Sequence, residues 1–527
     1  MSTHSRCLGF AKSLSTRRKY LKEREQKCMK LSKLLSAMPG ARIVSGAQDP
    51  AVTQLCHDSR EAEAGALFVA LQGLHRDGHD YAAAAVANGA TAVLVTRPLS
   101  LPEHVTQVLV PDTWVAIGQA AAVFYGNPSQ ELCVIGVTGT DGKSTTTTLI
   151  GHILRSCGHQ SGVITTVAFH DSRQEYPNET RLTTQHASDL QRMLRTVRNQ
   201  GGTHAVVEAS SHGLALHKLD AIEIDAAVLT NLSHEHLDFH KSLEAYREAK
   251  GLLFQRVKAR ASKPFPQVSV LNADDAHFSY FASIKPPGVR TYGLAKHADV
   301  RAIDVTLGAD HTTFTVVTPE GQTPVHAPLV CHFNVANTLA ALAVVSGLGV
   351  PLDAAAAAVG SFPGVPGRMQ VISAGQPFAA IVDYAHTPNS LRLVLDALRS
   401  VTPGRLVVVF GSAGERDVEK RTLMGEVAAE HADYFVITSE DPRSEDPDAI
   451  CRQIEEGALE AGCVYGRDYS ISVDRTQAFR IAFKQARPGD TVLLAGKGHE
   501  HSIIWGDESL PWDEARIASE TLADMFA

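Results

Sequence analysis

Several features are missing from this 527-residue sequence, and each absence excludes a class of protein. No apolar run approaches the roughly 20 residues of a membrane-spanning helix, so we expect no membrane partner and a cytoplasmic location. The eight cysteines are scattered without a C-x-x-C pair, which argues against a zinc site and for a reducing compartment. A net charge of −8 leaves no basic footprint, so a nucleic-acid partner is not indicated.

The composition is that of a globular protein, with 44% hydrophobic and 20% charged residues. A chain of this length is too long for one hydrophobic core, and about three domains are expected. Residues 1–28 form a basic, hydrophilic segment that lacks the apolar stretch of a signal peptide. We expect either a disordered tail or a start codon placed too early, with the first domain beginning at Met29.

The stretch from Val134 to Ser144 reads V-I-G-V-T-G-T-D-G-K-S and organises the rest of the chain. Residues 133–137 predict a buried parallel strand, glycines then break it, and a helix follows from Ser144. This arrangement aims backbone N–H groups and a helix dipole at one point, which suits a phosphate group. Lys143 would add a positive charge and the Ser144 hydroxyl a ligand for Mg²⁺. The alternative is a glycine turn that merely lets a helix pack on a strand.

The loop has the pattern G-x-x-G-K-S, two residues shorter than a Walker loop, and no N-K-x-D guanine signature accompanies it. A GTPase is therefore not indicated. Residues 138–144 instead resemble the T-G-T-N-G-K-T/S loop of the Mur ligases and folylpolyglutamate synthetases, which are ATP-dependent amide-forming enzymes. Asp141 stands where Asn is common. The resemblance implies that ATP contacts Gly139, Thr140, Asp141, Gly142, Lys143, Ser144 and Thr145.

Strands and polar turns alternate in residues 29–130. From the residues alone, Asp58, Ser59 and Arg60 would cap and pair between strands. D-S-R, followed by L-F-V-A-L-x-G and D-G-H-D-Y, resembles the uridine-binding domain of the E-type Mur ligases, which the folylpolyglutamate synthetases lack. The resemblance implies that Ser59 contacts a UDP-sugar.

Glu208, His236 and Asn272 end or follow apolar segments that we predict as strands, at 205–208, 226–231 and 268–272. Because the carboxyl ends of parallel strands share one edge, these side chains can meet near the glycine loop. Taken singly, a strand-end Glu can cap a helix and His236 can be a surface histidine. Together they match the E-S-S-H-G-L and N-L-x-x-D/E-H-L-D-x-H segments of the E-type ligases. The resemblance implies that Ser144, Glu208 and His236 bind Mg²⁺.

Lys250 lies on an amphipathic helical segment, where a lysine is usually a solvated surface charge. Its surroundings, Y-x-x-A-K-x-x-L-F, resemble the Mur ligase segment whose lysine is carbamylated by CO₂. That reaction needs a neutral amine, which burial near cations favours. The resemblance implies that Lys250, as a carbamate, helps to hold a second Mg²⁺ against ATP.

A Thr-rich turn at 181–190 is, by itself, a turn before a helix. It resembles the T-T-P-x-x-x-D-L segment that contacts the muramoyl peptide in the family. The implied substrate contacts are Thr183, Thr184, Ser210 and Lys218. Two departures leave the details open, because Gln185 replaces the usual Pro, and Leu216 with Lys218 stands where related sequences have Gln and Arg.

Asn334 opens an alanine-rich helical segment and can cap it or hydrogen-bond a base. F-N-x-x-N-x-x-A-A resembles the adenine-side helix of the family and implies a nucleotide contact. Residues 363–367 are the clearest linker, and Arg368 follows them as in the P-G-R hinge of the family, whose arginine reaches the ATP phosphates. V-D-Y-A-H-T-P is highly specific to these ligases and implies that Asp383 lies beside the nucleotide.

Three later predicted strands, at 406–410, 434–437 and 491–494, each precede a polar loop, and these loops are expected at one sheet edge. Such an edge suits a zwitterionic amino acid with a charged far end, although ordinary surface ion pairs are the alternative. E-type ligases specific for meso-diaminopimelate have D-N-P-R where this chain has E-D-P-R. Arg443 favours a second substrate carboxylate, whereas Asp441 could suit the bare amine of lysine or ornithine. The implied pocket residues are Arg416, Asp441, Arg443, Gly496 and Glu500.

The resemblance covers nearly everything from Met29 onward and implies an α/β protein of three domains. These are a small uridine-binding domain at 29–130, a central P-loop domain with a parallel sheet at 131–366, and a Rossmann-like amino-acid-binding domain at 367–527. The implied activity adds a diamino acid, with meso-diaminopimelate favoured, to UDP-N-acetylmuramoyl-L-alanyl-D-glutamate through an acyl phosphate, in peptidoglycan precursor synthesis. The catalytic residues would be Lys143, His236, Lys250 and Arg368.

Two other functions stay open. One is a ligase that uses the same chemistry on folate or another peptide acceptor, and the other is a nucleotide-gated switch without a second substrate. We expect a monomer.

Overall fold

The computed structural model describes residues 28–46, 49–73, 76–178, 180, 182–233, 235, 237–308 and 310–526. The chain divides into two compact units, the first with residues up to 131, 185–198 and 213–222, and the second with 132–184, 199–212 and 223–527. The predicted domain boundaries therefore stay predictions, and the predicted tail falls almost wholly outside the described residues. None of the helices in the described ranges is both long and apolar enough to cross a bilayer.

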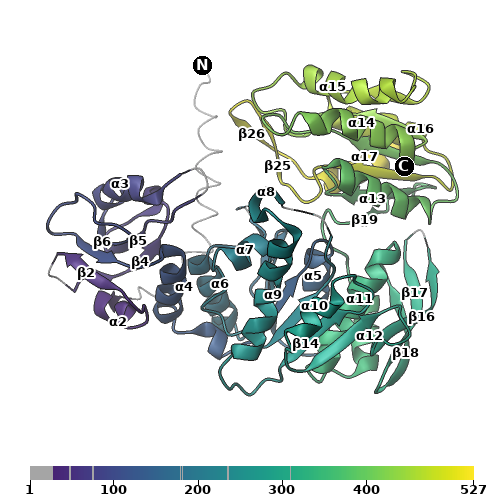
Figure 1. Cartoon of the computed structure of the whole chain (residues 1–527). Helices are drawn as coiled ribbons and strands as arrows, with labels where there is room; N and C mark the ends of the chain where they lie inside the picture. Colours follow the sequence, from purple (N-terminus) through teal and green to yellow (C-terminus); the bar gives the residue numbers. More distant parts are fainter. Residues whose placement is uncertain are drawn as a thin grey trace. The chain divides into compact units, whose positions relative to one another are not determined.

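The first unit is built on a five-stranded sheet in which only β2 runs antiparallel to its neighbour. Helices α2 (Leu31–Leu35) and α4 (Thr113–Phe124) pack on one face, and α3 (Ala82–Ala87) packs on the other (Figure 1). In order, the strands are β2 (Arg42–Ser45), β7 (Thr106–Leu109), β6 (Ala90–Val95), β5 (Ala66–Val69) and β4 (Gln54–Cys56). A separate ladder pairs β1 (Met29–Lys30) with β3 (Ala51–Val52).

The second unit contains an eleven-stranded sheet whose centre is parallel. Its parallel strands, in spatial order, are β9 (Ser161–Ile164), β12 (His204–Glu208), β8 (Cys133–Thr138), β13 (Ala226–Leu229), β14 (Val268–Asn272), β15 (Val289–Gly293) and β16 (Val300–Leu307). Antiparallel strands extend both edges, namely β10 (Ala168–His170) and β11 (Glu175–Pro177) at one end and β17 (Thr312–Thr318) and β18 (Gly321–Ala327) at the other.

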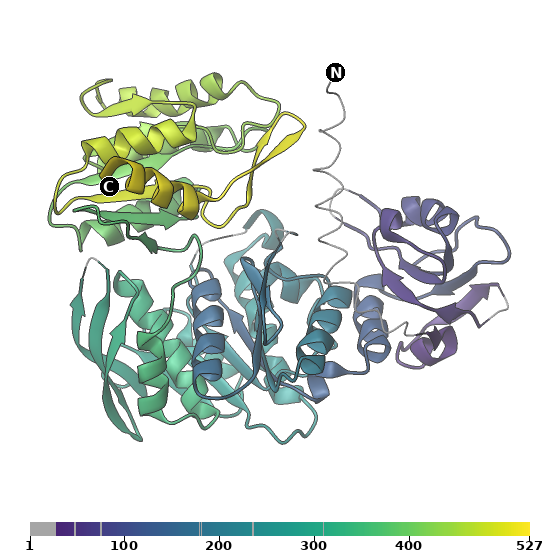
Figure 2. The same cartoon turned by 180° about the vertical axis from the view of Figure 1, so that it is seen from behind.

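Helices cover both faces of the parallel centre (Figures 1 and 2). The core on one face is shared with α5 (Lys143–Ser156), α11 (His332–Gly347) and α12 (Leu352–Gly360). Helix α9 (Leu243–Ala259), capped by the Ser242 hydroxyl, packs against β8, β13 and β14, and α10 (Phe278–Ser283) packs against β14. The second unit also contains α8 (Leu237–His240), whereas α6 (Ala187–Asn199) belongs almost wholly to the first unit and α7 (Ser211–Ala215) is divided between the two.

A six-stranded sheet forms the C-terminal part of the second unit, with β19 antiparallel and the other strands parallel. In order they are β19 (Gln370–Ile372), β20 (Ala379–Asp383), β24 (Thr491–Ala495), β21 (Leu406–Phe410), β22 (Tyr434–Ile437) and β23 (Tyr469–Ile471). One face carries α13 (Pro388–Arg399), α14 (Glu419–His431) and α15 (Pro447–Glu460); the other carries α16 (Arg475–Gln485) and α17 (Glu514–Phe526). A hairpin of β25 (Ser502–Trp505) and β26 (Glu508–Pro511) follows β24.

Candidate functional site

The glycine loop lies between β8 and α5, as the sequence predicts, although the helix begins at Lys143 rather than Ser144. Gly142 precedes the helix in the left-handed region, with a φ of 78°, and a Cβ there would lie 2.2 Å from Asn337 Oδ1. Gly139 packs so tightly against Thr230 that a Cβ would overlap its hydroxyl. Both positions therefore require glycine, because conformation and space each exclude a side chain at Gly142 and space does so at Gly139.

The end of β13 braces the tip of this loop. Asn231 accepts a hydrogen bond from Asp141 N through its side chain (2.9 Å) and one from Thr140 N through its carbonyl (2.9 Å). The Thr230 hydroxyl donates to Asp141 O (2.6 Å), and the Asn272 amide on β14 donates to Thr230 O (2.7 Å). The predicted meeting of strand ends at the loop is thus present for Asn272, and Asn231 is a contributor that sequence reasoning missed.

Two lysines point at the same backbone carbonyl. Lys143 Nζ donates to Gly139 O (3.1 Å) and Thr140 O (2.6 Å), while Lys250 Nζ donates to Gly139 O (2.6 Å). Lys250 is 1% exposed, and burial, followed by the charge of Lys143, holds its pKa well below the ordinary value. Its ammonium also lies 4.3 Å from the centre of the Tyr246 ring. The surface-lysine alternative for Lys250 is therefore excluded.

Glu208 lies at the end of β12 with Ser144 directly opposite. The Ser144 hydroxyl lies 3.1 Å from both carboxylate oxygens, and Thr166 donates through its N–H (2.9 Å) and hydroxyl (3.1 Å). Both residues are buried, and no lysine, arginine or histidine of the described ranges forms an ion pair with Glu208. His236, the third predicted metal ligand, lies outside the described residues. Among the residues that are described, no group of three His, Cys, Asp or Glu side chains is placed to hold a metal ion.

The nucleotide contacts implied farther along the chain lie at the start of α11 and of the C-terminal sheet. Asn334 does not cap α11, because it lies inside the helix and Cys331 precedes it; its amide donates to Val330 O (2.8 Å). Asp383 accepts hydrogen bonds from Met369 N (2.8 Å) and Ala385 N (2.9 Å), and burial raises its pKa while the charge of Arg368 opposes that rise. The Arg368 guanidinium lies 4.8 Å from the centre of the Tyr384 ring.

The predicted substrate hydroxyls lie in the second unit. Thr184 is buried, lies 3.0 Å from the Ser210 hydroxyl and donates to Glu208 O (3.0 Å), so these hydroxyls adjoin the backbone of the candidate metal ligand. Thr183 is half-buried.

The other two predicted contacts belong to the first unit. Ser59 is buried and begins a short 3₁₀ turn, Ser59–Glu61, capped by Asp58. Lys218 is buried, and this burial lowers its pKa to about 8.

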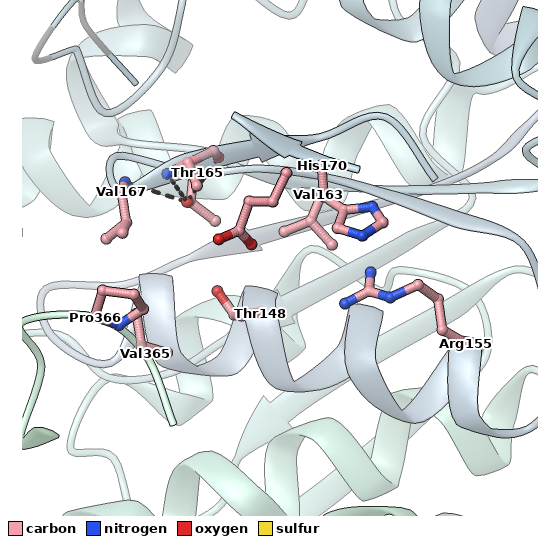
Figure 3. Close-up of a pocket in the computed structure, with 10 residues that line it drawn as sticks. Thr148, Arg155, Val163, Thr165, Val167, His170, Val365 and Pro366 are labelled. Atoms are coloured by element: carbon pink, nitrogen blue, oxygen red, sulfur yellow. Dashed lines mark hydrogen bonds between the residues drawn. The ribbon is translucent and has the colours of Figure 1, made fainter. Parts of the chain in front are cut away.

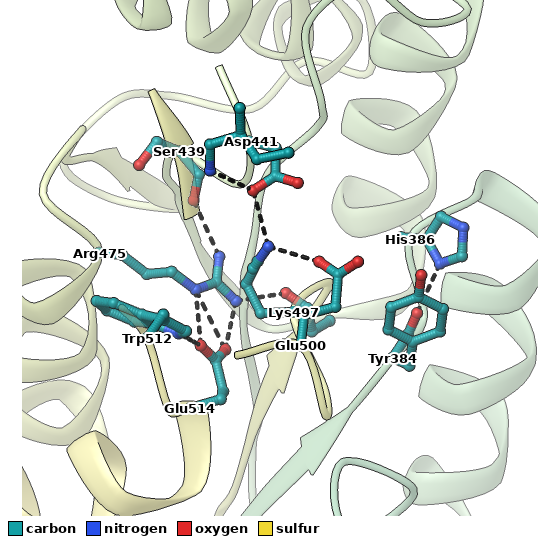
Figure 4. A network of polar contacts seen from close by, with 11 residues as sticks. Tyr384, His386, Ser439, Asp441, Arg475, Lys497, Glu500, Trp512 and Glu514 are labelled. Atoms are coloured by element: carbon teal, nitrogen blue, oxygen red, sulfur yellow. Dashed lines mark hydrogen bonds and ion pairs between the residues drawn. The ribbon is translucent and has the colours of Figure 1, made fainter. Parts of the chain in front are cut away.

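In the C-terminal sheet, the loops that follow β21, β22 and β24 meet at one edge, as predicted. Gly414 N donates to Asp441 O (2.9 Å), and Lys497 Nζ lies 2.8 Å from Asp441 Oδ1 and 2.5 Å from Glu500 Oε2 (Figure 4). Gly496, in the left-handed region, faces the buried carboxyl of Glu440.

The two arginines of this pocket differ in burial. Arg416 is exposed and Arg443 is half-buried, with its Nε buried and without a hydrogen-bond partner among the described residues. Sequence reasoning took Lys497 only as part of a loop, and nothing in its G-K-G setting distinguishes it from a solvated lysine.

A cavity beside α5 is separate from these groups (Figure 3). Thr148 and Arg155 line it from the helix, and Val365 and Pro366 line it from the linker. None of the predicted site residues lines it, so it is not the nucleotide cradle.

Comparison with known proteins identifies the family of this chain. Family models match in three places: the Mur ligase family, catalytic domain, at residues 51–129; the Mur ligase middle domain at 137–345; and the Mur ligase, glutamate ligase domain, at 367–498. A UDP-N-acetylmuramyl-tripeptide synthetase from Roseiflexus sp. (strain RS-1) is 43% identical over 488 residues, which cover 90% of this chain and 96% of the relative.

A UDP-N-acetylmuramoyl-L-alanyl-D-glutamate–2,6-diaminopimelate ligase from Bacillus velezensis is 38% identical over 497 residues, or 94% of this chain and 99% of the relative. A solved structure of a ligase with that name superposes with a TM-score of 0.66 at 33% identity, covering 95% of this chain and all (100%) of the other. The chain therefore belongs to the Mur ligase family, and its sequence and three-domain α/β fold are of the MurE type.

Proposed function

We propose that the protein is an ATP-dependent ligase that joins a diamino acid to UDP-N-acetylmuramoyl-L-alanyl-D-glutamate in peptidoglycan precursor synthesis. The observation that carries the proposal is the convergence on one glycine loop of Lys143, Lys250 and the Ser144–Glu208 pair. The printed names of the MurE-type relatives support this choice of substrates.

The reaction proceeds in two steps. The terminal carboxylate of the D-Glu residue attacks the γ-phosphorus of ATP, a carboxyl–phosphate bond forms, and the bond to ADP breaks. The neutral amine of the diamino acid then attacks the acyl carbon, loses a proton, and phosphate leaves. Carboxylate and triphosphate repel each other, so the positive charges of Lys143 and Arg368 lower the barrier of the first step. Closure of the C-terminal domain over the acyl phosphate would exclude water.

Mg²⁺ fits the residues at the end of β12. Glu208 is a buried carboxylate whose described partners are hydroxyls and an N–H group rather than a cation, and Mg²⁺ is usually bound by one or two carboxylates together with substrate phosphates. Ser144 and Glu208 would hold the ion, with His236 and a carbamylated Lys250 as further ligands. When bound, Mg²⁺ would neutralise phosphate charge.

The pocket at the C-terminal sheet favours meso-diaminopimelate. Arg443 offers a guanidinium for a second carboxylate, and its buried Nε has no partner among the described residues. The charge of Asp441, which could have suited lysine or ornithine, is already paired with Lys497.

One assay tests the proposal, namely phosphate release with UDP-N-acetylmuramoyl-L-alanyl-D-glutamate and, in parallel, meso-diaminopimelate, L-lysine and L-ornithine. We expect release that requires both substrates and is fastest with meso-diaminopimelate. Turnover only with a folate or another peptide acceptor would mean that the protein is a ligase of the same chemistry that acts on a different substrate. If the protein binds ATP but its release of ADP does not depend on a diamino acid, the alternative of a nucleotide-gated switch protein would be favoured.

A further inference from the structure

One buried ammonium joins two acidic side chains of the candidate diamino-acid pocket (Figure 4). The side chain of Lys497 is 0% exposed, and its Nζ lies within 2.8 Å of Asp441 and 2.5 Å of Glu500. Two carboxylates this close would repel each other strongly without a cation between them. Lys497 therefore fixes the distance between the loop after β22 and the loop after β24.

A second ion pair fixes the strand ends from which these loops leave. Arg475 is 2% exposed and donates to Ser439 O (3.1 Å) and Ala495 O (2.7 Å), the residues just before Glu440 and Gly496. Glu514 on α17 holds this guanidinium and accepts in turn from Trp512 Nε1 (2.5 Å). Both loops therefore start from strand ends that Arg475 holds together, and Lys497 connects the two loops beyond those ends.

Asp441 also holds the hairpin that follows. Its Oδ1 accepts from Ile504 N (2.9 Å), and Arg443 N donates to Ile504 O (3.0 Å). The Asp441 carboxylate therefore links both loops to β25, and the same contacts set the backbone of Arg443. The Asp441 carboxylate therefore has a structural role in the pocket, and the positive charge of Lys497 offsets its negative charge.

We propose that Lys497 is a positioning residue that sets the specificity of the diamino-acid pocket. By pairing with both Asp441 and Glu500, it leaves the three groups with one net negative charge. That charge suits one substrate ammonium, next to the Arg443 guanidinium for one substrate carboxylate. The pocket would thus select a diamino acid whose far end carries both groups. This inference rests on the proposed function.

Replacing Lys497 tests the inference. We expect Lys497→Met to raise the KM for the diamino acid at least tenfold, while the KM values for ATP and the UDP-sugar stay within twofold and kcat within threefold. The matched control is Lys263→Met, which removes another buried lysine, bonded to Asp225 in the middle domain. It should lower thermal stability without changing the KM for the diamino acid.

Two further variants extend the test, and the first of them, Asp441→Asn, keeps it decisive if Lys497→Met does not fold. Asp441→Asn should change the preference for meso-diaminopimelate over L-lysine by less than threefold, because Asp441 binds Lys497 rather than substrate. Combining Asp441→Asn with Lys497→Met restores the net charge of the Asp441, Lys497 and Glu500 positions. The KM of this double variant for the diamino acid should be at least threefold lower than that of Lys497→Met.

Three results would overturn the inference: an unchanged KM in Lys497→Met, an equal rise in all three KM values, or a tenfold switch of preference in Asp441→Asn. If the parent enzyme itself turns over no diamino acid, the proposed function fails instead.

Discussion

Two ammonium groups share the carbonyl of Gly139, and this crowding explains the chemistry expected of Lys250. A buried amine beside the charge of Lys143 loses its proton readily, and a neutral amine can attack CO₂. The resulting carbamate would place a negative charge at this position. A side chain of α9 that reaches the glycine loop as an amine would thereby become a ligand for Mg²⁺.

We predict that Lys250→Ala lowers the rate of phosphate release about 10²–10³-fold, the size expected when one preorganised charged group is lost from an active site. Lys258→Ala, which removes an exposed lysine of the same helix, is the matched control and should keep nearly full activity. Thermal unfolding would show that both variants fold. Undiminished activity of Lys250→Ala would rule out the role.

Glu440 gives a prediction for stability. Burial raises its pKa from 4.5 to about 7, although Lys420, Lys497 and Arg475 oppose the rise. The folded state then binds this proton more tightly than the unfolded state, so stability falls as pH rises from about 4.5 through 7. A shift of this size corresponds to about 2–4 kcal/mol at pH 8.

Glu440→Gln should remove this loss, so the unfolding midpoint of the variant should fall less between pH 5 and pH 8 than that of the parent. Glu456→Gln, an exposed carboxylate on α15, is the control and should follow the parent. Thermal unfolding at the two pH values measures the difference. If the unfolding midpoints of all three proteins change by the same amount between the two pH values, Glu440 is ionised in the folded state and the prediction is wrong.

At the scale of elements, the sequence predicts those strands whose apolar runs end in glycine or polar residues. Strands β14, β21 and β22 have the predicted bounds, because each is buried along its length and stops at a loop. No strand was predicted between β14 and α11, where β15 to β18 extend the sheet. In β17, buried and half-buried residues alternate along Thr312–Thr318, and this alternation is the sequence pattern that could have predicted the strand.

The junction of β8 and α5 gives the prediction at this scale. Gly142→Ala places a methyl group 2.2 Å from Asn337 Oδ1 and forces alanine into the left-handed region. That conformation alone costs about 1–2 kcal/mol, and the clash should also displace the loop. We expect the KM for ATP to rise about tenfold or more, equivalent to roughly 1.4 kcal/mol.

Gly158→Ala, just beyond the other end of α5, is the control for this variant. Gly158 has a φ of 87° and no atom within 4 Å of a Cβ built there, so it has the strain without the clash. It should lower thermal stability but leave the KM for ATP unchanged. Equal KM values for ATP in the two variants would show that strain alone accounts for the effect.

For the whole molecule, the sequence could identify the two sheet edges where polar loops collect, because parallel strands direct their carboxyl ends to one side. It could not identify which charges are already paired inside the protein. Lys497 shows this limit, since Lys497 and Glu500 lie in the loop after β24 but Asp441 lies in the loop after β22, and only the fold brings Asp441 to Lys497. Asn231 shows it again, because its contacts to the glycine loop span about 90 residues of sequence.

Arg368 tests whether the C-terminal domain takes part in chemistry on the nucleotide. It follows the linker, yet the proposed mechanism assigns its charge to the phosphates bound at the glycine loop of the middle domain. We therefore predict that Arg368→Ala lowers kcat about 10²-fold or more, as expected for the loss of a charge that stabilises the transition state. The KM for the diamino acid should change little.

Chemical rescue separates this role from a structural one. Arg368 also lies over the Tyr384 ring, so its removal can lower stability for reasons unrelated to catalysis. Free guanidinium ions at millimolar concentration should restore part of the kcat of Arg368→Ala, whereas Arg368→Lys, which keeps the charge without the planar fork, should be intermediate and respond less. Phosphate and product should still form in equal amounts. A kcat within threefold of the parent would mean that the domain following the linker binds the amino acid but contributes no charge to the phosphoryl transfer.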